Sequence, residues 1–179
     1  MDAATVREAR PEDATAISRL HVEAWRWAYA EIMPPGHLAS LDPKPRQAMW
    51  ASRLATAEGR ARVAVAHVGE ELAGFVSWGR YRPDGHGDGT DLGDAVGEVQ
   101  AIYLGRRHQG RGIGRALLAR AVDGLTAAGH GEAKLWVLED NTLARRFYER
   151  QGWATDGARA VEDFAGRPLV ELRYGRPLR

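Results

Sequence analysis

The 179-residue sequence contains no cysteine, which removes three classes of chemistry at once. Without thiols the chain can form no disulfide framework, and it offers neither a cysteine nucleophile nor cysteine ligands for zinc. Its six histidines are scattered without metal-ligand spacing, so we expect no metal site. The chain also lacks any apolar run approaching the roughly 20 residues of a membrane-spanning helix. Residues 1–8 lack the apolar core of a secretory signal, so we expect a soluble, cytoplasmic protein with no membrane partner.

The chain also has no large excess of positive or negative charge. The 25 basic residues are balanced by 24 acidic ones, and a formal net charge of +1 argues against a general nucleic-acid binder. With 44% hydrophobic and 27% charged residues, the composition is typical of a globular protein rather than a disordered chain. The length predicts one domain over residues 1–179, and a homodimer is compatible with it.

Hydrophobic periodicity divides the chain into strands and helices. Strands are expected over residues 5–9, 62–68, 72–78, 96–104, 133–138, 153–161 and 168–174. Helices are expected from residue 11 to about residue 28, and over 45–57, 112–128 and 142–151. This order predicts a mixed α/β sheet domain. Residues 83–93 form a Gly/Asp-rich loop, which is either a surface connection or a lid over a substrate pocket.

One segment concentrates glycine and positive charge. Residues 102–122 hold five arginines and His108 but no Asp or Glu. Within it, Gly110, Gly112 and Gly114 allow close backbone approach where a strand leads into a helix. The unpaired N–H groups and the dipole of that helix N-terminus suit a phosphate. The alternative is a tight turn with a solvated basic face.

The spacing excludes two common phosphate-binding motifs. The segment has no Lys followed by Ser or Thr, as the P-loop of nucleotide-binding proteins requires. It also fails the G-x-G-x-x-G pattern of dinucleotide-binding domains, because Arg115 or Leu117 stands where the third glycine is required.

The segment Gln109-Gly110-Arg111-Gly112-Ile113-Gly114 instead resembles the Q/R-x-x-G-x-G/A pyrophosphate signature of the GNAT family of acetyl-CoA-dependent N-acetyltransferases. The resemblance covers nearly the whole chain. Upstream, Ile102-Tyr103-Leu104 is similar to the family's fourth strand. Downstream, Asn141, Ala144, Phe147-Tyr148-Glu149 and Gly152-Trp153 resemble its N-x-x-A-x-x-F-Y-x-x-x-G-F block, with Trp153 in place of the usual Phe.

The resemblance implies a GNAT fold: a single domain with a mostly antiparallel sheet of six to seven strands and about four helices. It implies acetyl-CoA as co-substrate. The backbone of Ile102, Tyr103 and Leu104 would lie along the pantetheine arm or acetyl carbonyl. Asn141 would contact the cofactor, and Tyr148 would lie near its sulfur. The pyrophosphate would be held by the loop residues Gln109, Gly110, Arg111, Gly112, Ile113, Gly114 and Arg115.

Two residues are candidates for proton transfer. Tyr148 could protonate the departing sulfur as a general acid, since a phenol keeps its proton at neutral pH; alternatively, it is a tyrosine of the core. Glu98, on the strand that leads into the cofactor loop, could remove the amine proton directly or through a water. Alternatively, Glu98 is an exposed strand-end carboxylate, and a chain of waters carries the proton.

The acceptor side is less specified. Trp25, Trp27 and Tyr29, near the end of the first long helix, could form a wall that attracts a cationic amine, or they pack on the sheet. The resemblance implies a primary amine on an amino acid, polyamine, antibiotic or protein N-terminus. Two other classes stay open: a non-catalytic acyl-CoA-binding regulatory module on the same fold, and an RNA-binding domain, which no aromatic RNA-binding motif supports.

Overall fold

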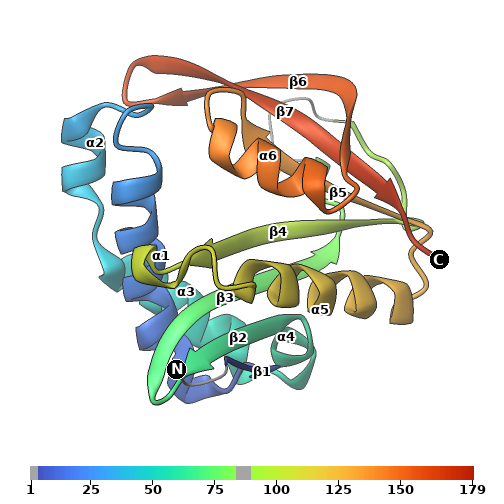
Figure 1. Ribbon diagram of the computed structural model, residues 1–179, viewed down its shortest axis with the longest axis horizontal. Helices are drawn as coiled ribbons and strands as arrows, with labels where there is room; N and C mark the ends of the chain where they lie inside the picture. Colours follow the sequence, from blue (N-terminus) through green and yellow to red (C-terminus); the bar gives the residue numbers. More distant parts are fainter. Residues whose placement is uncertain (1–3, 84–89) are drawn as a thin grey trace.

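The computed structural model describes residues 4–83 and 90–179 (Figure 1). Most of the Gly/Asp-rich loop, residues 84–89, therefore lies outside the described residues, as does the lid interpretation of it. In the described ranges, no helix combines the length and apolarity needed to cross a bilayer.

Seven strands form one sheet in the order β1-β2-β3-β4-β5-β7-β6. The strands are β1 (Thr5–Glu8), β2 (Val63–Val68), β3 (Glu71–Arg80), β4 (Val96–Leu104), β5 (Glu132–Leu138), β6 (Ala154–Phe164) and β7 (Arg167–Pro177). All neighbouring pairs are antiparallel except β4 and β5, which are parallel. The predicted mostly antiparallel sheet of six to seven strands is thus confirmed.

Six α-helices are present in the described residues, where about four were expected. They are α1 (Ala14–Ala28), α2 (Pro35–Ser40), α3 (Pro43–Ala55), α4 (Ala57–Ala61), α5 (Ile113–Ala127) and α6 (Thr142–Arg150). The two extra helices, α2 and α4, are short. The proline-rich segment after α1 begins α2: Pro34 is the N-cap, and Pro35 lies in the first turn, where a missing N–H costs nothing.

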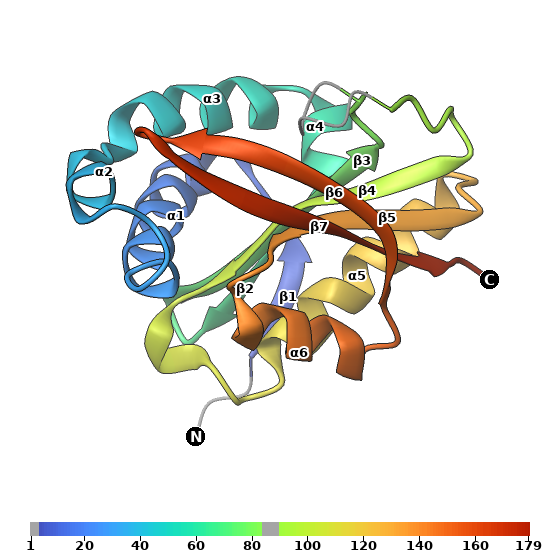
Figure 2. The same ribbon diagram turned by 90° about the horizontal axis from the view of Figure 1, so that it is seen from above.

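The helices cover both faces of the sheet. On one face, α5 packs through Ile113, Leu117 and Leu125 onto the central strands. On the other face, α1 and α3 pack through residues such as Ile17 and Leu54. A third apolar cluster joins the tip of the β6–β7 hairpin to α1 and α2 (Figure 2). The hairpin therefore closes over the α1 side of the molecule.

The parallel pair β4 and β5 separates soon after it begins. Within the described residues, their ladder covers Val96–Glu98 against Glu132–Lys134. Beyond it, β4 continues to Leu104 beside β3 alone, and the two strands diverge (Figure 1). The Gly105 N–H donates to the Ala73 carbonyl at 2.9 Å, which fixes the alternation of the antiparallel ladder. By this alternation the N–H groups of Ile102 and Leu104 point away from β3, into the gap between β4 and β5.

Candidate active site

The β4–α5 loop has the backbone of an anion site. Gly110 and Gly112 have φ of +70° and +79°, and Gly112 is the N-cap of α5. Apart from the adjoining residues, no heavy atom of the described chain lies within 4 Å of the position of a Cβ on either glycine, so the loop surface is open there. The first intrahelical bond runs from the Ala116 N–H to the Gly112 carbonyl. The preceding N–H groups of α5 therefore have no partner within the helix.

The basic cluster of the sequence is partly neutralised from another strand. Glu71, at the start of β3, pairs with Arg107, and its Oε1 lies 3.1 Å from Nε2 of the buried His108. Interaction with His108, and then with Arg107, lowers the pKa of the Glu71 carboxyl. This contact fixes the short turn Arg106–His108 to the sheet. Arg120 belongs elsewhere: its guanidinium lies 5.3 Å from the ring centre of Trp78.

The loop lies beside β4 and α6. A Cβ on Gly114 would lie 3.4 Å from Phe147 of α6 and 3.5 Å from Leu104 of β4, which is ordinary contact. Asn141 is the N-cap of α6, and its Oδ1 accepts from the Ala144 N–H at 3.1 Å. Capping uses the Asn141 oxygen and leaves its NH₂ group for other contacts. The structure thus brings the two halves of the predicted cofactor site together.

Tyr148 is buried near the end of α6. It is 8% exposed, with its ring centre 5.3 Å from that of Phe147 and 6.4 Å from those of Trp153 and Tyr174. Burial, and then the neighbouring Tyr103 phenol, raises the pKa of Tyr148 well above its usual range. The Tyr148 phenol therefore keeps its proton at neutral pH.

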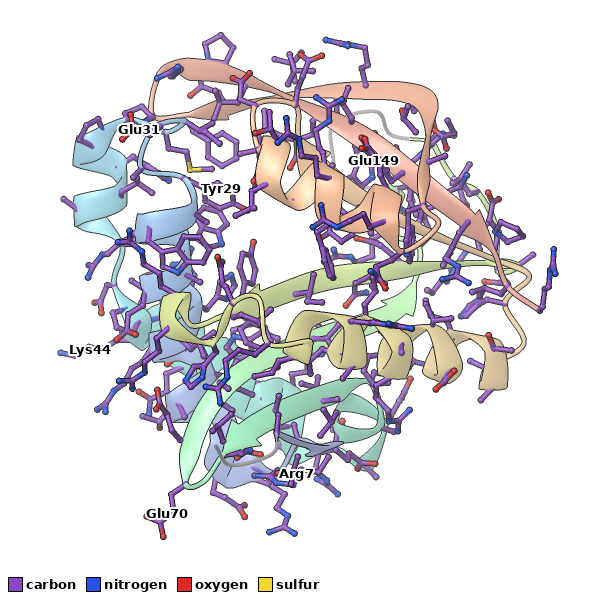
Figure 3. The ribbon with its side chains drawn as sticks, viewed as in Figure 1. Arg7, Tyr29, Glu31, Lys44, Glu70 and Glu149 are labelled. Carbon is purple, nitrogen blue, oxygen red and sulfur yellow. The ribbon has the colours of Figure 1, made fainter. Side chains whose placement is uncertain are left out.

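One face of α1 carries an aromatic cluster. His21, Trp25 and Tyr29 follow each other at four-residue spacing, and the His21 ring stacks on Tyr103 of β4 with ring centres 4.8 Å apart. The hydroxyls of Tyr29 and Tyr103 lie 3.3 Å apart. In Figure 3, Tyr29 lies between α1 and α6. Of the three predicted wall residues, the structure therefore groups Trp25 with Tyr29. Trp27, two residues from Trp25, faces about 200° around the helix and lies outside this cluster.

The electrostatics join Tyr148 to this cluster. Burial raises the pKa of Tyr29, and the phenols of Tyr103 and Tyr148 and the carboxylate of Glu171 raise it further. Burial also raises the pKa of Tyr103, although its hydrogen bond with Tyr29 acts against the rise. The three phenols come from α1, β4 and α6 and lie where β4 and β5 separate. Each of them therefore keeps its own proton at neutral pH.

His21 provides a test of this packing. Burial, and then the charge of Arg46, lowers the pKa of His21 to about 3. Unfolded histidine titrates near 6.5. Between these values the unfolded chain binds a proton that the folded chain does not, so stability should fall as the pH falls. Relative to wild type, His21→Phe should gain up to about 1.4 kcal/mol of unfolding free energy per pH unit below pH 6.5.

Urea unfolding of both proteins between pH 7 and 4.5 measures this difference. Phe retains a ring that can stack on Tyr103 but cannot titrate. A difference in unfolding free energy that does not change with pH would contradict a buried neutral imidazole.

Glu98 is buried. The alternative interpretation, an exposed carboxylate at the end of a strand, is therefore wrong. Glu98 is 0% exposed and accepts hydrogen bonds from Arg82: from the backbone N–H at 3.0 Å, from Nε at 3.1 Å and from Nη2 at 2.6 Å. It is also the last β4 residue in the ladder with β5. Its carboxylate is therefore paired with a guanidinium at the point where the two strands separate.

Three residues at this site were not found by sequence reasoning. His21 could have been, because its four-residue spacing to Trp25 is visible in the sequence. Arg46 of α3 and Glu171 of β7 had no local signal, since tertiary packing alone brings them here. Among the described residues no group of three or more His, Asp or Glu side chains could hold a metal ion.

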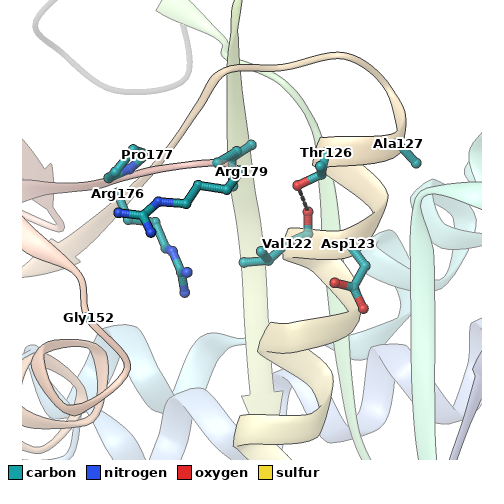
Figure 4. Close-up of a pocket in the computed structure, with 9 residues that line it drawn as sticks. Val122, Asp123, Thr126, Ala127, Gly152, Arg176, Pro177 and Arg179 are labelled. Atoms are coloured by element: carbon teal, nitrogen blue, oxygen red, sulfur yellow. Dashed lines mark hydrogen bonds between the residues drawn. The ribbon is translucent and has the colours of Figure 1, made fainter.

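A large cavity lies elsewhere. It measures about 510 Å³ and opens between the C-terminal half of α5 and the end of β7 (Figure 4). Its lining includes Asp123, Thr126, Arg176 and Arg179. It is at the opposite end of α5 from the glycine loop, so it is separate from the site described above.

Comparison with known proteins gives concordant matches. Residues 15–153 match the model of the acetyltransferase (GNAT) family. The N-acetyltransferase YuaI of Bacillus subtilis, itself uncharacterised, is 38% identical over 97% of this chain and 92% of its own. The structure of yncA from Salmonella typhimurium with its cofactor acetyl-CoA has a TM-score of 0.72 at 22% identity, covering 99% of this chain and 95% of that one. PaiA N-acetyltransferase from Thermoplasma acidophilum, in complex with coenzyme A, has a TM-score of 0.71 at 18% identity. The match covers 98% of this chain and 99% of that one.

Proposed function

The chain belongs to the GNAT family of acetyltransferases, and from that premise we propose that it transfers the acetyl group of acetyl-CoA directly to a primary amine of a small molecule or a protein N-terminus. The observation that carries the proposal is the combination of two features at one place. The gap between β4 and β5 exposes backbone donors of β4, and the open glycine loop lies at the end of that same strand.

The gap and the loop fit an extended, pyrophosphate-containing cofactor. The N–H groups of Ile102 and Leu104 point into the gap, where they can pair with the pantetheine arm or the acetyl carbonyl as with a neighbouring strand. The N-terminus of α5 and its positive-φ glycines suit the pyrophosphate. In this proposal the cofactor is held by Ile102, Tyr103, Leu104, Gln109, Gly110, Arg111, Gly112, Ile113, Gly114, Arg115 and Asn141.

The chain's own groups supply proton transfer and polarisation. Bound acetyl-CoA supplies the activated acetyl group. The Leu104 N–H donates to the acetyl oxygen as negative charge develops there. Tyr148, protonated at neutral pH, donates to the departing sulfur. Trp25 and Tyr29 form the acceptor wall, while Trp27 lies outside the cluster that they form.

Release of CoA in the presence of a panel of primary amines tests this function. An acetyltransferase releases CoA faster when a suitable amine is added. A regulatory module that binds acyl-CoA would bind it without amine-dependent release, and that result would overturn the proposed activity.

Glu98 is our proposed acceptor of the amine proton, through a water. An alkylamine with a pKa near 10 is uncharged in only about one molecule in a thousand at neutral pH. Glu98→Gln should lower kcat/KM about tenfold at pH 7, and the loss should shrink as the pH rises toward 10, where the amine deprotonates unaided. The ratio of kcat/KM between the two proteins, recorded from pH 7 to 10, measures this.

The matched control is Asp13→Asn. Asp13 is also buried, at 6% exposure, and accepts from Arg7 at 2.7 and 2.8 Å beside β1. Loss of the Asp13 carboxylate breaks a similar pair with arginine but leaves the proposed site untouched. The ratio of kcat/KM between Asp13→Asn and the wild type should therefore not vary with pH. If Glu98→Gln also gives a pH-independent ratio, Glu98 serves the structure through Arg82 and a water chain carries the proton.

A further inference from the structure

The aromatic cluster is flanked by two opposite charges from different elements. Arg46 of α3 lies one helical turn before the buried Trp50, and its guanidinium is 5.3 Å from the ring centre of Trp25. Trp50 in turn lies 6.4 Å from His21. The packing of α3 on α1 therefore holds a cation over the Trp25 ring of the cluster.

The carboxylate comes from another element, the strand β7. Glu171 lies on β7, opposite Leu138 of β5. Leu169, two residues earlier and so on the same face of the strand, is buried in the cluster that Tyr29 and Trp25 pack against. The closure of the β6–β7 hairpin over α1 thus brings the strand face that carries the half-buried Glu171 to the apolar cluster against which Tyr29 packs.

The electrostatics agree with this placement. The Glu171 carboxylate adds to the rise that burial causes in the pKa of both Tyr29 and Tyr103. The Arg46 charge adds to the fall that burial causes in the pKa of His21. The anion therefore acts on both phenols, while the cation acts on the imidazole and also opposes the rise in the pKa of Tyr103.

We propose that the acceptor is a zwitterionic primary amine of the α-amino acid type, with its amino group toward Glu171 and its carboxylate bound by Arg46. This inference rests on the proposed acetyltransferase function. Glu171, whose carboxylate acts on the Tyr29 and Tyr103 phenols, attracts the ammonium group. Arg46 can hold a carboxylate through two parallel N–H donors. His21 adds a polar atom: its Nδ1 is buried with no hydrogen-bond partner in the part of the chain that the structure describes.

Three acceptors with one side chain test the proposal: an α-amino acid, its carboxamide and its decarboxylated amine. CoA release should give a kcat/KM about tenfold higher for the amino acid than for the two others, the size expected of a charge-assisted contact. Arg46→Met, which keeps an unbranched apolar stem, should remove that preference by lowering kcat/KM for the amino acid more than for the other two acceptors. Arg46→Lys should keep part of it. Glu171→Gln should raise KM for all three.

Arg120→Met is the matched control. Its guanidinium also lies 5.3 Å from a tryptophan ring centre, on the α5 face of the sheet, so its loss should not change the order of acceptors. Equal use of the amino acid and its amide by the wild type would overturn the proposal. An equal loss of kcat/KM for all three acceptors in Arg46→Met would also overturn it, as would acetylation of a peptide N-terminus alone. In those cases amine-dependent CoA release would still stand; its absence with every amine would overturn the acetyltransferase function as well.

Discussion

Replacing Gly112 with aspartate should weaken the binding of acetyl-CoA about 10³-fold, from the micromolar to the millimolar range. The new carboxylate would stand at the N-terminus of α5, where the pyrophosphate is proposed to bind. Two unit charges about 4 Å apart near a protein surface repel by about 4 kcal/mol, and every ~1.4 kcal/mol is a factor of ten in affinity. Titration calorimetry with acetyl-CoA measures the change directly.

Two other glycine variants separate charge from backbone strain. Gly112→Ala introduces the backbone strain of a side chain at φ = +79° but no charge. It should lose far less affinity for acetyl-CoA than Gly112→Asp. Gly129→Asp introduces the same side chain at the other end of α5, where φ is +86°. Beyond the neighbouring residues, no atom of the part that the structure describes lies within 4 Å of a Cβ there. Gly129→Asp should bind acetyl-CoA like the wild type. Unchanged affinity in a folded Gly112→Asp protein would remove the cofactor from this loop.

Elements with strong local signals were predicted well. The bounds of β4, residues 96–104, agree with the expectation, and those of α5 and α6 agree to within one residue. In α5 the buried Ile113, Leu117 and Leu125 repeat at helical spacing, and a glycine stands at each end. In α6, Asn141 caps the helix through the N–H three residues later. These signals lie within a few residues of each other, so the sequence alone carries them.

The separation of β4 from β5 was not predicted, because it depends on pairing between segments about 35 residues apart. Nothing local in residues 99–104 distinguishes a strand paired on both edges from one paired on a single edge. The acceptor side shows the same limit. Arg46 and Glu171 come from α3 and β7, and packing of α3 and closure of the β6–β7 hairpin bring them to the cluster.

Position along a helix explains why only two of the three predicted wall residues lie together. Trp25, Trp27 and Tyr29 are close in sequence, but residues two apart point to different sides of a helix. Trp25 and Tyr29 share the face of His21, with the Trp25 and Tyr29 ring centres 5.2 Å apart. Helical spacing would have selected His21 over Trp27.

Replacing Tyr148 with phenylalanine should lower kcat by about 10²-fold or more and leave the affinity for acetyl-CoA nearly unchanged. Phe keeps the ring that packs against Phe147, Trp153 and Tyr174, so the substitution removes only the hydroxyl. Because burial raises the pKa of Tyr148 well above its usual range, the wild type should show no loss of the acid form between pH 7 and 9. The drop in kcat should therefore be constant across that range, unlike the pH-dependent loss expected of Glu98→Gln.

The control for Tyr148→Phe is a tyrosine of the same packing cluster. Tyr174 is 1% exposed, donates its hydroxyl proton to Glu149 at 2.9 Å and accepts from Arg145 at 3.1 Å. Tyr174→Phe also removes one buried hydroxyl, and it should cost stability, measured by thermal unfolding, with little change in kcat. Single-turnover rates at saturating acetyl-CoA then separate the two roles. If Tyr148→Phe turns over as fast as wild type, the phenol of Tyr148 belongs to the core, and the departing sulfur takes its proton from solvent.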